Sequence, residues 1–180
     1  MNFEFRPFSF EDVPLMHEWL NRPHVAEWWH GRATLEEVEE DCAERIASAF
    51  VASYLACLDG TPVGYIQVYH VMSPSPDWWK DETDPGARGI DQFLANASQI
   101  GKGIGTAMIT QFVNKLFRDP EVTKIQVDPA PNNLRAIRAY EKCGFRREGL
   151  VDTPDGPALL MVLRRDDGCL LYTSPSPRDS

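Results

Sequence analysis

Three glycines at alternate positions, in Gly101-Lys-Gly-Ile-Gly105, separate a segment of strand character from a segment with helical periodicity. This spacing lets several backbone N–H groups converge without interference from Cβ atoms. A helix that begins there adds the positive end of its dipole, so the turn can bind a diphosphate. A tight turn without a ligand is the alternative. No Lys-Ser/Thr pair follows the last glycine, and the preceding strand is not the first of the chain, which argues against a P-loop and a Rossmann fingerprint.

The rest of the chain alternates between strand and helix patterns. Apolar periodicity and turn residues predict the order β-α-α-β-β-loop-β-α-β-α-β-β. Thr34 and Glu37 have the spacing of a capping box, and Asp59-Gly60 is typical of a hairpin turn. A hairpin combined with β-α-β crossovers indicates an α/β protein with a mixed sheet. The predicted strands cover residues 2–7, 53–58, 62–71, 89–97, 122–127, 145–152 and 158–164; the predicted helices cover 9–20, 35–48, 106–117 and 132–142; residues 23–33 and 72–88 are predicted as loops.

Composition narrows the class of partner. The chain has 180 residues and a net charge of −9, so it lacks the basic face that nucleic acids and anionic membranes require. A cationic ligand, or plain solubility, is compatible with that charge. The cysteines show no metal-ligand spacing, and no apolar run approaches the roughly 18 residues of a membrane span. We therefore expect a metal-free cytoplasmic protein, monomeric or weakly dimeric, with one domain at 1–165 and a disordered or non-native tail at 166–180.

A second motif follows the glycine turn. It reads Asn132-Asn-Leu-Arg-Ala-Ile-Arg-Ala-Tyr140-Glu-Lys-Cys-Gly144-Phe145, a predicted helix closed by glycine. Together, and in this order, the two motifs resemble the GNAT superfamily of N-acetyltransferases. The resemblance implies a mixed, mostly antiparallel central sheet flanked by helices, with a splayed strand pair that binds acetyl-CoA.

The resemblance also implies which residues contact the coenzyme. Backbone amides from Gly101 to Thr106 would bind the pyrophosphate, and Asn133 would contact the pantetheine arm. Tyr140 would lie beside the sulfur, where its phenol can protonate the departing thiolate; a partly buried helix tyrosine is the structural alternative. The implied coenzyme-binding residues are Phe93, Gly101, Lys102, Gly103, Ile104, Gly105, Thr106 and Asn133.

Further segments resemble one group of enzymes within this superfamily. Trp78-Trp-Lys-Asp-Glu-Thr-Asp-Pro-Gly86, Arg88-Gly-Ile-Asp-Gln92 and Thr153-Pro-Asp-Gly-Pro157 are similar to the aminoglycoside 6′-N-acetyltransferases of type Ib. The similarity runs from about Phe3 to Arg164. It implies acetyl transfer from acetyl-CoA to the 6′-amine of an aminoglycoside by direct attack in a ternary complex, which confers resistance.

An aminoglycoside carries several ammonium groups, so its site needs carboxylates and flat aromatic faces. By resemblance, Asp91 is the general base or holds the amine for deprotonation. Asp128 would bind an amine, or it is a turn residue at a strand end. Trp29 and Trp78 would line the drug. Asp155 would flank the acceptor cleft, although a Pro-Asp-Gly-Pro turn explains an aspartate without any function.

Two other functions remain open from the sequence. The same fold could acetylate another amine, such as a siderophore precursor or a protein N-terminus. The chain could also be a non-catalytic module that binds acetyl-CoA or a cationic ligand, although the presence of both Asp91 and Tyr140 disfavours that reading.

Overall fold

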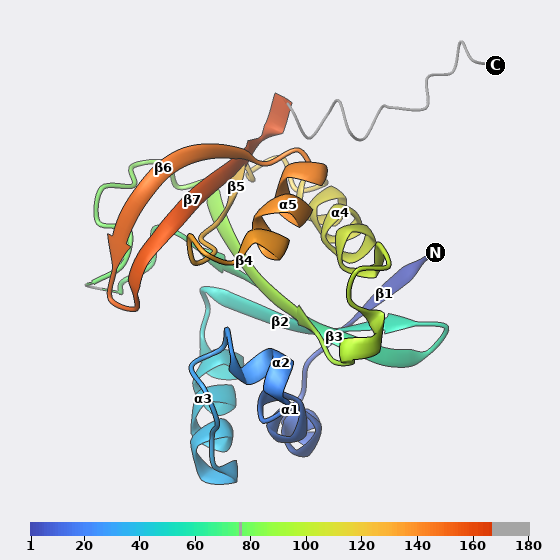
Figure 1. Cartoon of the computed structure of the whole chain (residues 1–180). Coiled ribbons are helices and arrows are strands. Elements are labelled where there is room, and N and C mark those ends of the chain that lie inside the picture. Colours follow the sequence, from blue (N-terminus) through green and yellow to red (C-terminus); the bar gives the residue numbers. More distant parts are fainter. Residues whose placement is uncertain (76, 167–180) are drawn as a thin grey trace, which may run out of the picture. The chain divides into compact units, whose positions relative to one another are not determined.

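Seven strands pair in the order β1-β2-β3-β4-β5-β7-β6 within the part of the chain that the structure describes (Figure 1). The computed structural model describes residues 1–75 and 77–166. They form two units, of which the first comprises Met1–Tyr69 and Asp91–Gly105, and the second comprises His70–Ile90 and the residues from Thr106 onward. Apart from Asp166, the predicted tail at 166–180 lies outside the described residues.

Most elements begin and end close to where their local signals predict. The strands are β1 (Phe3–Pro7), β2 (Val51–Leu58), β3 (Thr61–His70), β4 (Ala87–Leu94), β5 (Lys124–Val127), β6 (Arg146–Thr153) and β7 (Gly156–Arg164). The α-helices are α1 (Val13–Leu20), α2 (Pro23–Ala26), α3 (Leu35–Ala47), α4 (Ile104–Leu116) and α5 (Leu134–Lys142), and two 3-10 turns lie at Phe10–Asp12 and Ala97–Gln99.

Three of the differences from the prediction have a physical reason that the structure shows. The expected loop at 23–33 contains α2, whose Val25 is 1% exposed, so burial stabilises a helix too short to be read from periodicity. The helix expected from residue 9 begins as a 3-10 turn and becomes α-helical only at Val13. The strand expected at 89–97 begins two residues earlier, because Ala87 pairs with Lys124, and ends at Leu94.

The sheet is mixed and mostly antiparallel, which confirms the predicted fold class. The pairs β1–β2, β2–β3, β5–β7 and β6–β7 are antiparallel, and β4–β5 is parallel. The parallel ladder runs from Ala87↔Lys124 to Gly89↔Gln126, whereas β4 itself continues to Leu94. The ladder with β5 therefore covers only the first part of β4.

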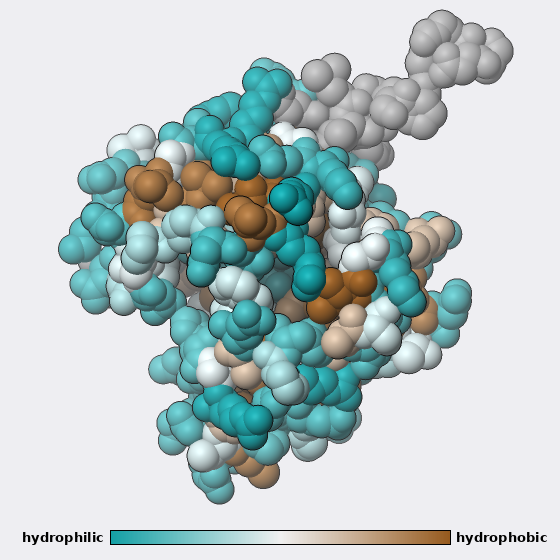
Figure 2. Space-filling view, viewed as in Figure 1, coloured by the Kyte–Doolittle hydropathy of each residue, from teal (hydrophilic) through white to brown (hydrophobic). Residues whose placement is uncertain are grey.

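The first unit has a core between its strands and α1, α2 and α3, which lie together in Figure 1. Met16 and Leu55 are fully buried there. Thr34 caps α3 as predicted, since its hydroxyl accepts a hydrogen bond from the N–H of Glu37. Helix α3 buries Val38 and Cys42, one turn apart, and exposes acidic side chains on its other face, where Figure 2 is largely hydrophilic.

The second unit has its own core. Phe112 of α4, Ile125 of β5, and Met161 and Leu163 of β7 are all fully buried. Met161 and Leu163 alternate along β7, so they share the face of the strand that points into this core. Strands β6 and β7 form the long, curved hairpin of Figure 1.

Candidate active site

The glycine turn has the backbone that its sequence predicts. Gly101 and Gly103 each have a φ of 81°, in the left-handed region that favours glycine. Residues 101–103 are exposed, and a Cβ placed at either glycine would meet no atom within 4 Å. The 13-residue helix α4 begins at Ile104, directly after the turn. The first N–H groups of a helix have no partner within it, so the helix start beside this exposed turn fits a diphosphate group.

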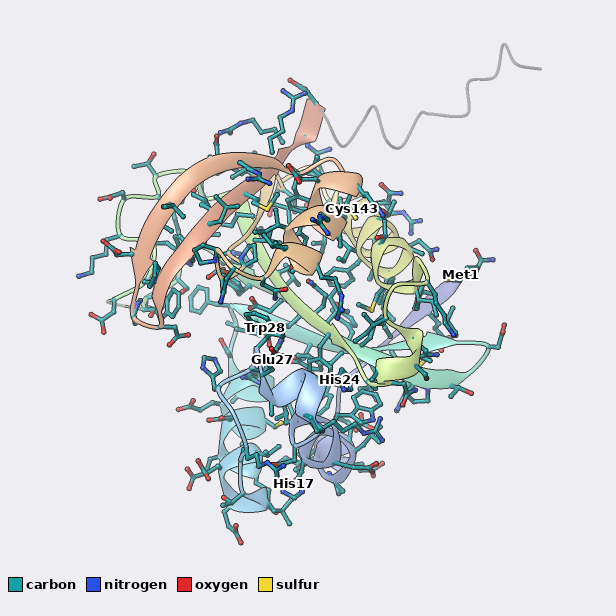
Figure 3. The ribbon with its side chains drawn as sticks, in the orientation of Figure 1. Met1, His17, His24, Glu27, Trp28 and Cys143 are labelled. Carbon is teal, nitrogen blue, oxygen red and sulfur yellow. The ribbon has the colours of Figure 1, made fainter. Side chains whose placement is uncertain are left out.

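Side chains from the α1–α2 region hold the segment that leads into the turn. Arg22 Nη1 donates to the carbonyl oxygen of Ala95 at 2.7 Å and to Oδ1 of Asn96 at 2.8 Å. His24, labelled on α2 in Figure 3, places its Nε2 2.9 Å from the carbonyl oxygen of Leu94. These contacts anchor the end of β4, from which the chain enters the glycine turn.

Asp91, the predicted base, is half-buried on β4. Its Oδ2 accepts a hydrogen bond of 2.9 Å from Nε2 of Gln67 on β3. This contact orients the carboxylate, and an ionised carboxylate can accept a proton. The arrangement suits a general base or an anchor for an ammonium group.

Two predicted site residues, Trp29 and Phe93, pack against each other. Their ring centroids lie 5.0 Å apart at an interplanar angle of 81°. Both rings also contact Tyr65, Trp29 edge-on at 5.9 Å and Phe93 stacked at 5.7 Å. The side chain of Phe93 is 8% exposed and belongs to the core of the first unit, whereas Trp29 is half-buried. The roles expected of both residues toward a ligand stay predictions.

In the second unit, Asn133 and Tyr140 lie at the start and within the last turn of α5. Oδ1 of Asn133 caps the helix by accepting a hydrogen bond of 3.3 Å from the N–H of Ala136. The carboxamide N–H groups of Asn133 are the donors that can serve a ligand. Tyr140 is 7% exposed, and its ring packs edge-to-face on Phe145 at 5.6 Å. The ring therefore has a structural role, and the chemical role of its hydroxyl stays a prediction.

Cys143, labelled in Figure 3, ties the start of α4 to the end of α5. Its thiol donates to the carbonyl oxygen of Thr106 at 3.6 Å and accepts a hydrogen bond of 3.5 Å from the hydroxyl of Thr110. Burial raises the pKa of the Cys143 thiol, and the Thr110 hydrogen bond lowers it less. Burial likewise raises the pKa of Cys42. Protonated, buried thiols are poor nucleophiles, so these two residues are unsuited to covalent catalysis.

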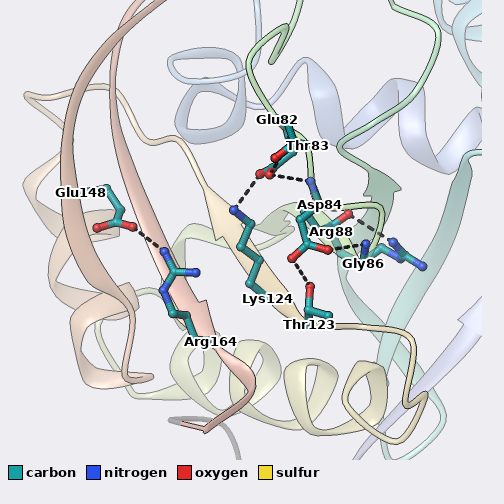
Figure 4. Close-up of polar contacts among 10 residues, drawn as sticks. Glu82, Thr83, Asp84, Gly86, Arg88, Thr123, Lys124, Glu148 and Arg164 are labelled. Atoms are coloured by element: carbon teal, nitrogen blue, oxygen red, sulfur yellow. Dashed lines mark hydrogen bonds and ion pairs between the residues drawn. The ribbon is translucent and has the colours of Figure 1, made fainter.

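The segment between β3 and β4, which carries Trp78, is attached to the β5 region (Figure 4). Glu82 Oε1 lies 2.8 Å from Nζ of Lys124, and both side chains are largely buried. Asp84 accepts hydrogen bonds from the hydroxyl of Thr123 at 2.6 Å and from the N–H of Gly86 at 2.8 Å. These two hydrogen bonds, and then the charge of Lys124, lower the pKa of Asp84.

The remaining predicted acceptor residues also belong to the second unit. Trp78 and the adjacent Trp79 are half-buried, with ring centroids 5.9 Å apart. Asp128 follows β5 directly and is half-buried. Asp155 is exposed in the β6–β7 turn, where its N–H donates to the hydroxyl of Thr153 at 3.1 Å. That contact fits the turn-residue explanation of Asp155. The roles of Trp78, Asp128 and Asp155 toward an acceptor stay predictions.

The described residues hold neither a metal-binding cluster nor a membrane-spanning helix. Within residues 1–75 and 77–166, no group of three or more His, Cys, Asp or Glu side chains has a geometry that could hold a metal ion. In the same part of the chain, every helix is too short or too polar to cross a membrane.

Residues 9–153 match the family model described as an acetyltransferase (GNAT) domain. The chain belongs to the GNAT family. This finding confirms the family and the fold that the two sequence motifs predict.

Other GNAT proteins resemble the chain over most of its length. It is 55% identical, over 164 residues, to aminoglycoside N(6′)-acetyltransferase type 1 of Klebsiella pneumoniae, a match that covers 89% of this chain and 82% of the relative. The structure of AAC(6′)-Ib in complex with coenzyme A and kanamycin superimposes with a TM-score of 0.89 at 49% identity, covering 97% of this chain and 99% of that one. The structure of AAC(6′)-Ib with paromomycin and acetyl-CoA gives a TM-score of 0.90 at 48% identity and covers both chains completely.

Sequence reasoning missed Gln67, the hydrogen-bond donor to Asp91. Gln67 and Tyr65 occupy alternate positions on a strand, and this spacing was the available signal that they share a face. Nothing local indicated that Asp91, 24 residues away in the sequence, would meet that face.

Proposed function

We propose that this chain transfers the acetyl group of acetyl-CoA to the 6′-amine of aminoglycosides by direct attack of the amine. The observation that carries the proposal is the open, left-handed backbone at Gly101 and Gly103 directly before α4, in a GNAT chain that resembles aminoglycoside N(6′)-acetyltransferases. That backbone offers converging N–H donors to the diphosphate of a coenzyme.

Bound acetyl-CoA supplies an activated thioester as the acetyl donor. In this proposal, the backbone amides between Gly101 and Thr106 bind its diphosphate, with Lys102, Ile104 and Gly105 as part of the same turn. Phe93 and Asn133 contribute further coenzyme contacts, Asn133 through its carboxamide toward the pantetheine arm. Tyr140 is the proton donor to the thiolate, since a phenol can give up its proton as negative charge develops on a nearby sulfur.

The acceptor amine reacts only in its neutral form, so a group must take its proton. Asp91 has the chemistry for this step, because its carboxylate is already oriented by Gln67. Asp128 and Asp155 would pair with other ammonium groups of the drug. Trp29 and Trp78 would pack on its sugar rings, and the faces of their indoles would attract its ammonium groups.

The test is release of coenzyme A thiol from acetyl-CoA in the presence of kanamycin. A matched control is an aminoglycoside whose 6′ position carries a hydroxyl instead of an amine. We expect rapid thiol release with the 6′-amine and little with the 6′-hydroxyl, and acetylation at the 6′-nitrogen by NMR of the product. Equal rates with both compounds, or no release by well-folded protein, would overturn the proposal.

A cellular experiment tests the consequence of the same reaction. Expression of the chain in a susceptible bacterium should raise the concentration of kanamycin needed to stop growth, and Asp91→Asn should remove most of that protection. Protection that persists fully in the Asp91→Asn variant would point to drug sequestration instead of acetylation.

A further inference from the structure

A row of hydrogen-bonding side chains crosses three strands of the first unit and ends at Asp91. Ser53 on β2 is the register partner of Gln67 on β3, and Tyr65 lies two residues before Gln67 on the same strand. All three therefore share one face of the sheet. The Tyr65 hydroxyl oxygen lies 2.9 Å from Oγ of Ser53 and 2.6 Å from Oε1 of Gln67, and Nε2 of Gln67 lies 2.9 Å from Oδ2 of Asp91.

The direction of these hydrogen bonds follows from donor chemistry. Oε1 of Gln67 can only accept, so Tyr65 must spend its one hydroxyl proton there and accept from the Ser53 hydroxyl in turn. Tyr65 at Oε1 and the Asp91 carboxylate at Nε2 together hold the carboxamide of Gln67 with its nitrogen toward Asp91. The flipped carboxamide would set its oxygen against the carboxylate, which has no proton to donate. Successive bonds of this kind polarise each other in the same direction.

Burial and aromatic contacts hold the ring of Tyr65 in place. Tyr65 is 1% exposed, and its ring contacts Phe8 and Trp29 edge-on and Phe93 stacked. Burial raises the pKa of Tyr65 above its ordinary value. Arg45 of α3 and the Ser53 hydrogen bond act in the opposite direction, whereas Cys42 of α3 and Asp91 of β4 act with burial. The phenol therefore remains protonated at neutral pH and remains a donor.

We propose that Tyr65, which accepts a hydrogen bond from Ser53, is a positioning residue that acts on the Asp91 carboxylate through Gln67. The inference rests on the proposed function, in which Asp91 takes the proton of the acceptor amine. A carboxamide cannot pass a proton along without changing its tautomer, so the row orients Asp91 and stabilises its negative charge instead of conducting protons. Fixing the carboxylate in this way keeps it ionised and aimed before the acceptor arrives.

The first experiment compares Tyr65→Phe with Tyr54→Phe. Tyr65→Phe keeps the ring contacts and removes the hydroxyl, whereas Tyr54 is the neighbour of Ser53 on β2 and belongs to the opposite face. Tyr65→Phe should lower kcat/KM for the aminoglycoside about fivefold, the factor expected for one lost hydrogen bond. The acidic limb of the pH–kcat/KM profile should move to higher pH, while the Kd of acetyl-CoA stays unchanged. Tyr54→Phe should change none of these quantities.

A double-mutant cycle tests whether Tyr65 acts through Asp91. In an Asp91→Asn background, Tyr65→Phe should cause no further loss of kcat/KM, because the group it positions is already gone. Losses that add in the double variant, or a Tyr65→Phe enzyme with an unchanged pH profile, would overturn the proposal.

The last measurement needs no acceptor and so separates this proposal from the proposed function. The side-chain carboxyl carbon of Asp91, followed by NMR in the intact chain alone, should titrate at higher pH in Tyr65→Phe than in the unaltered protein. Ser53→Ala, a smaller change at a half-buried position, should shift the titration in the same direction by less. Unchanged titration in the folded variants would overturn the positioning role even if the drug is acetylated. Absence of thiol release by the unaltered chain would overturn the proposed function alone.

Discussion

The hydroxyl of Thr123 donates a hydrogen bond of 2.6 Å to the carboxylate of Asp84, which lies 39 residues earlier in the chain. This contact, together with the Glu82–Lys124 ion pair of 2.8 Å, attaches the segment before β4 to the β5 region. Trp78, one of the predicted acceptor residues, is carried by that segment. Substitutions at Asp84 and its neighbours should therefore show how much this attachment contributes to the stability of the protein.

Replacement of Asp84 by asparagine should lower stability in a pH-dependent way. The hydrogen bonds from Thr123 and Gly86 lower the pKa of Asp84, so its stabilising contribution is present above the ordinary carboxyl pKa and is lost as the pH falls through the lowered value. Asp84→Asn should cost about 1 kcal/mol at pH 7, at the low end for a charged acceptor because the contact is partly exposed. Urea unfolding at pH 7 and pH 3 measures this, with the exposed Asp81→Asn as control. A difference that stays constant with pH would contradict the assignment.

Gly86 should not tolerate a methyl group. A Cβ at this position would collide with the carbonyl oxygen of Glu121 and would lie 2.7 Å from both the methyl carbon and the hydroxyl of Thr123. Gly86→Ala should therefore destabilise the protein by about 1–3 kcal/mol through overpacking. Gly105→Ala is the matched control, because its Cβ would lie at an ordinary 3.6 Å from Leu94 and it lies in helix α4. The control should unfold at equal or higher urea concentration.

Alanine at Gly103 should weaken acetyl-CoA binding, and a control glycine elsewhere separates this effect from backbone strain. Gly103 and Gly60 have the same φ of 81°, and neither has an atom within 4 Å of a built Cβ. Alanine at either position should cost about 1–2 kcal/mol of stability, since both would force a left-handed alanine. Gly103→Ala alone should also raise the Kd of acetyl-CoA, measured by calorimetry. Equal Kd values for the two variants would place the diphosphate elsewhere.

Removal of the Asp91 charge should slow turnover much more than it weakens coenzyme binding. Asparagine retains an oxygen that can accept from Gln67, so the local contact survives while the proton acceptor is lost. General base catalysis contributes on the order of 10²–10⁴-fold, and kcat of Asp91→Asn should fall within that range. Steady-state thiol release gives kcat, and calorimetry gives the Kd of acetyl-CoA. Parallel losses in both quantities would argue against a base.

The Tyr140 hydroxyl should matter for the departure of the thiolate. Tyr140→Phe keeps the ring that packs on Phe145 and removes the proton donor. We expect turnover to fall by up to about 10²-fold, toward the low end for general acids because a thiolate leaves readily. The basic limb of the pH–rate profile should be lost in the same variant. A turnover rate equal to that of the unaltered enzyme at every pH would refute the acid role.

Local signals predicted most of the fold because their physical causes are local. The Thr34–Glu37 capping box starts α3 at the expected residue, and the left-handed Asp59-Gly60 turn joins β2 to β3 as a hairpin. Helix α2 escaped prediction because a four-residue helix has no periodicity to read, and burial of Val25 stabilises it. The start of β4 at Ala87 depends on pairing with Lys124. Because Lys124 is distant in the sequence, no local pattern predicts this pairing.

The candidate site likewise combines features that the local sequence predicts with features that depend on tertiary contacts. The sequence by itself determined the glycine turn, because three alternating glycines before a helix allow the left-handed backbone seen at Gly101 and Gly103. It also determined the family, through residue types at defined spacing along one chain. Only the tertiary structure decided what touches Asp91. Gln67 contacts Asp91, and Tyr65 and Ser53 connect to Gln67, because strand register places the three on one face. Register is a relation between distant segments that neither propensity nor spacing contains.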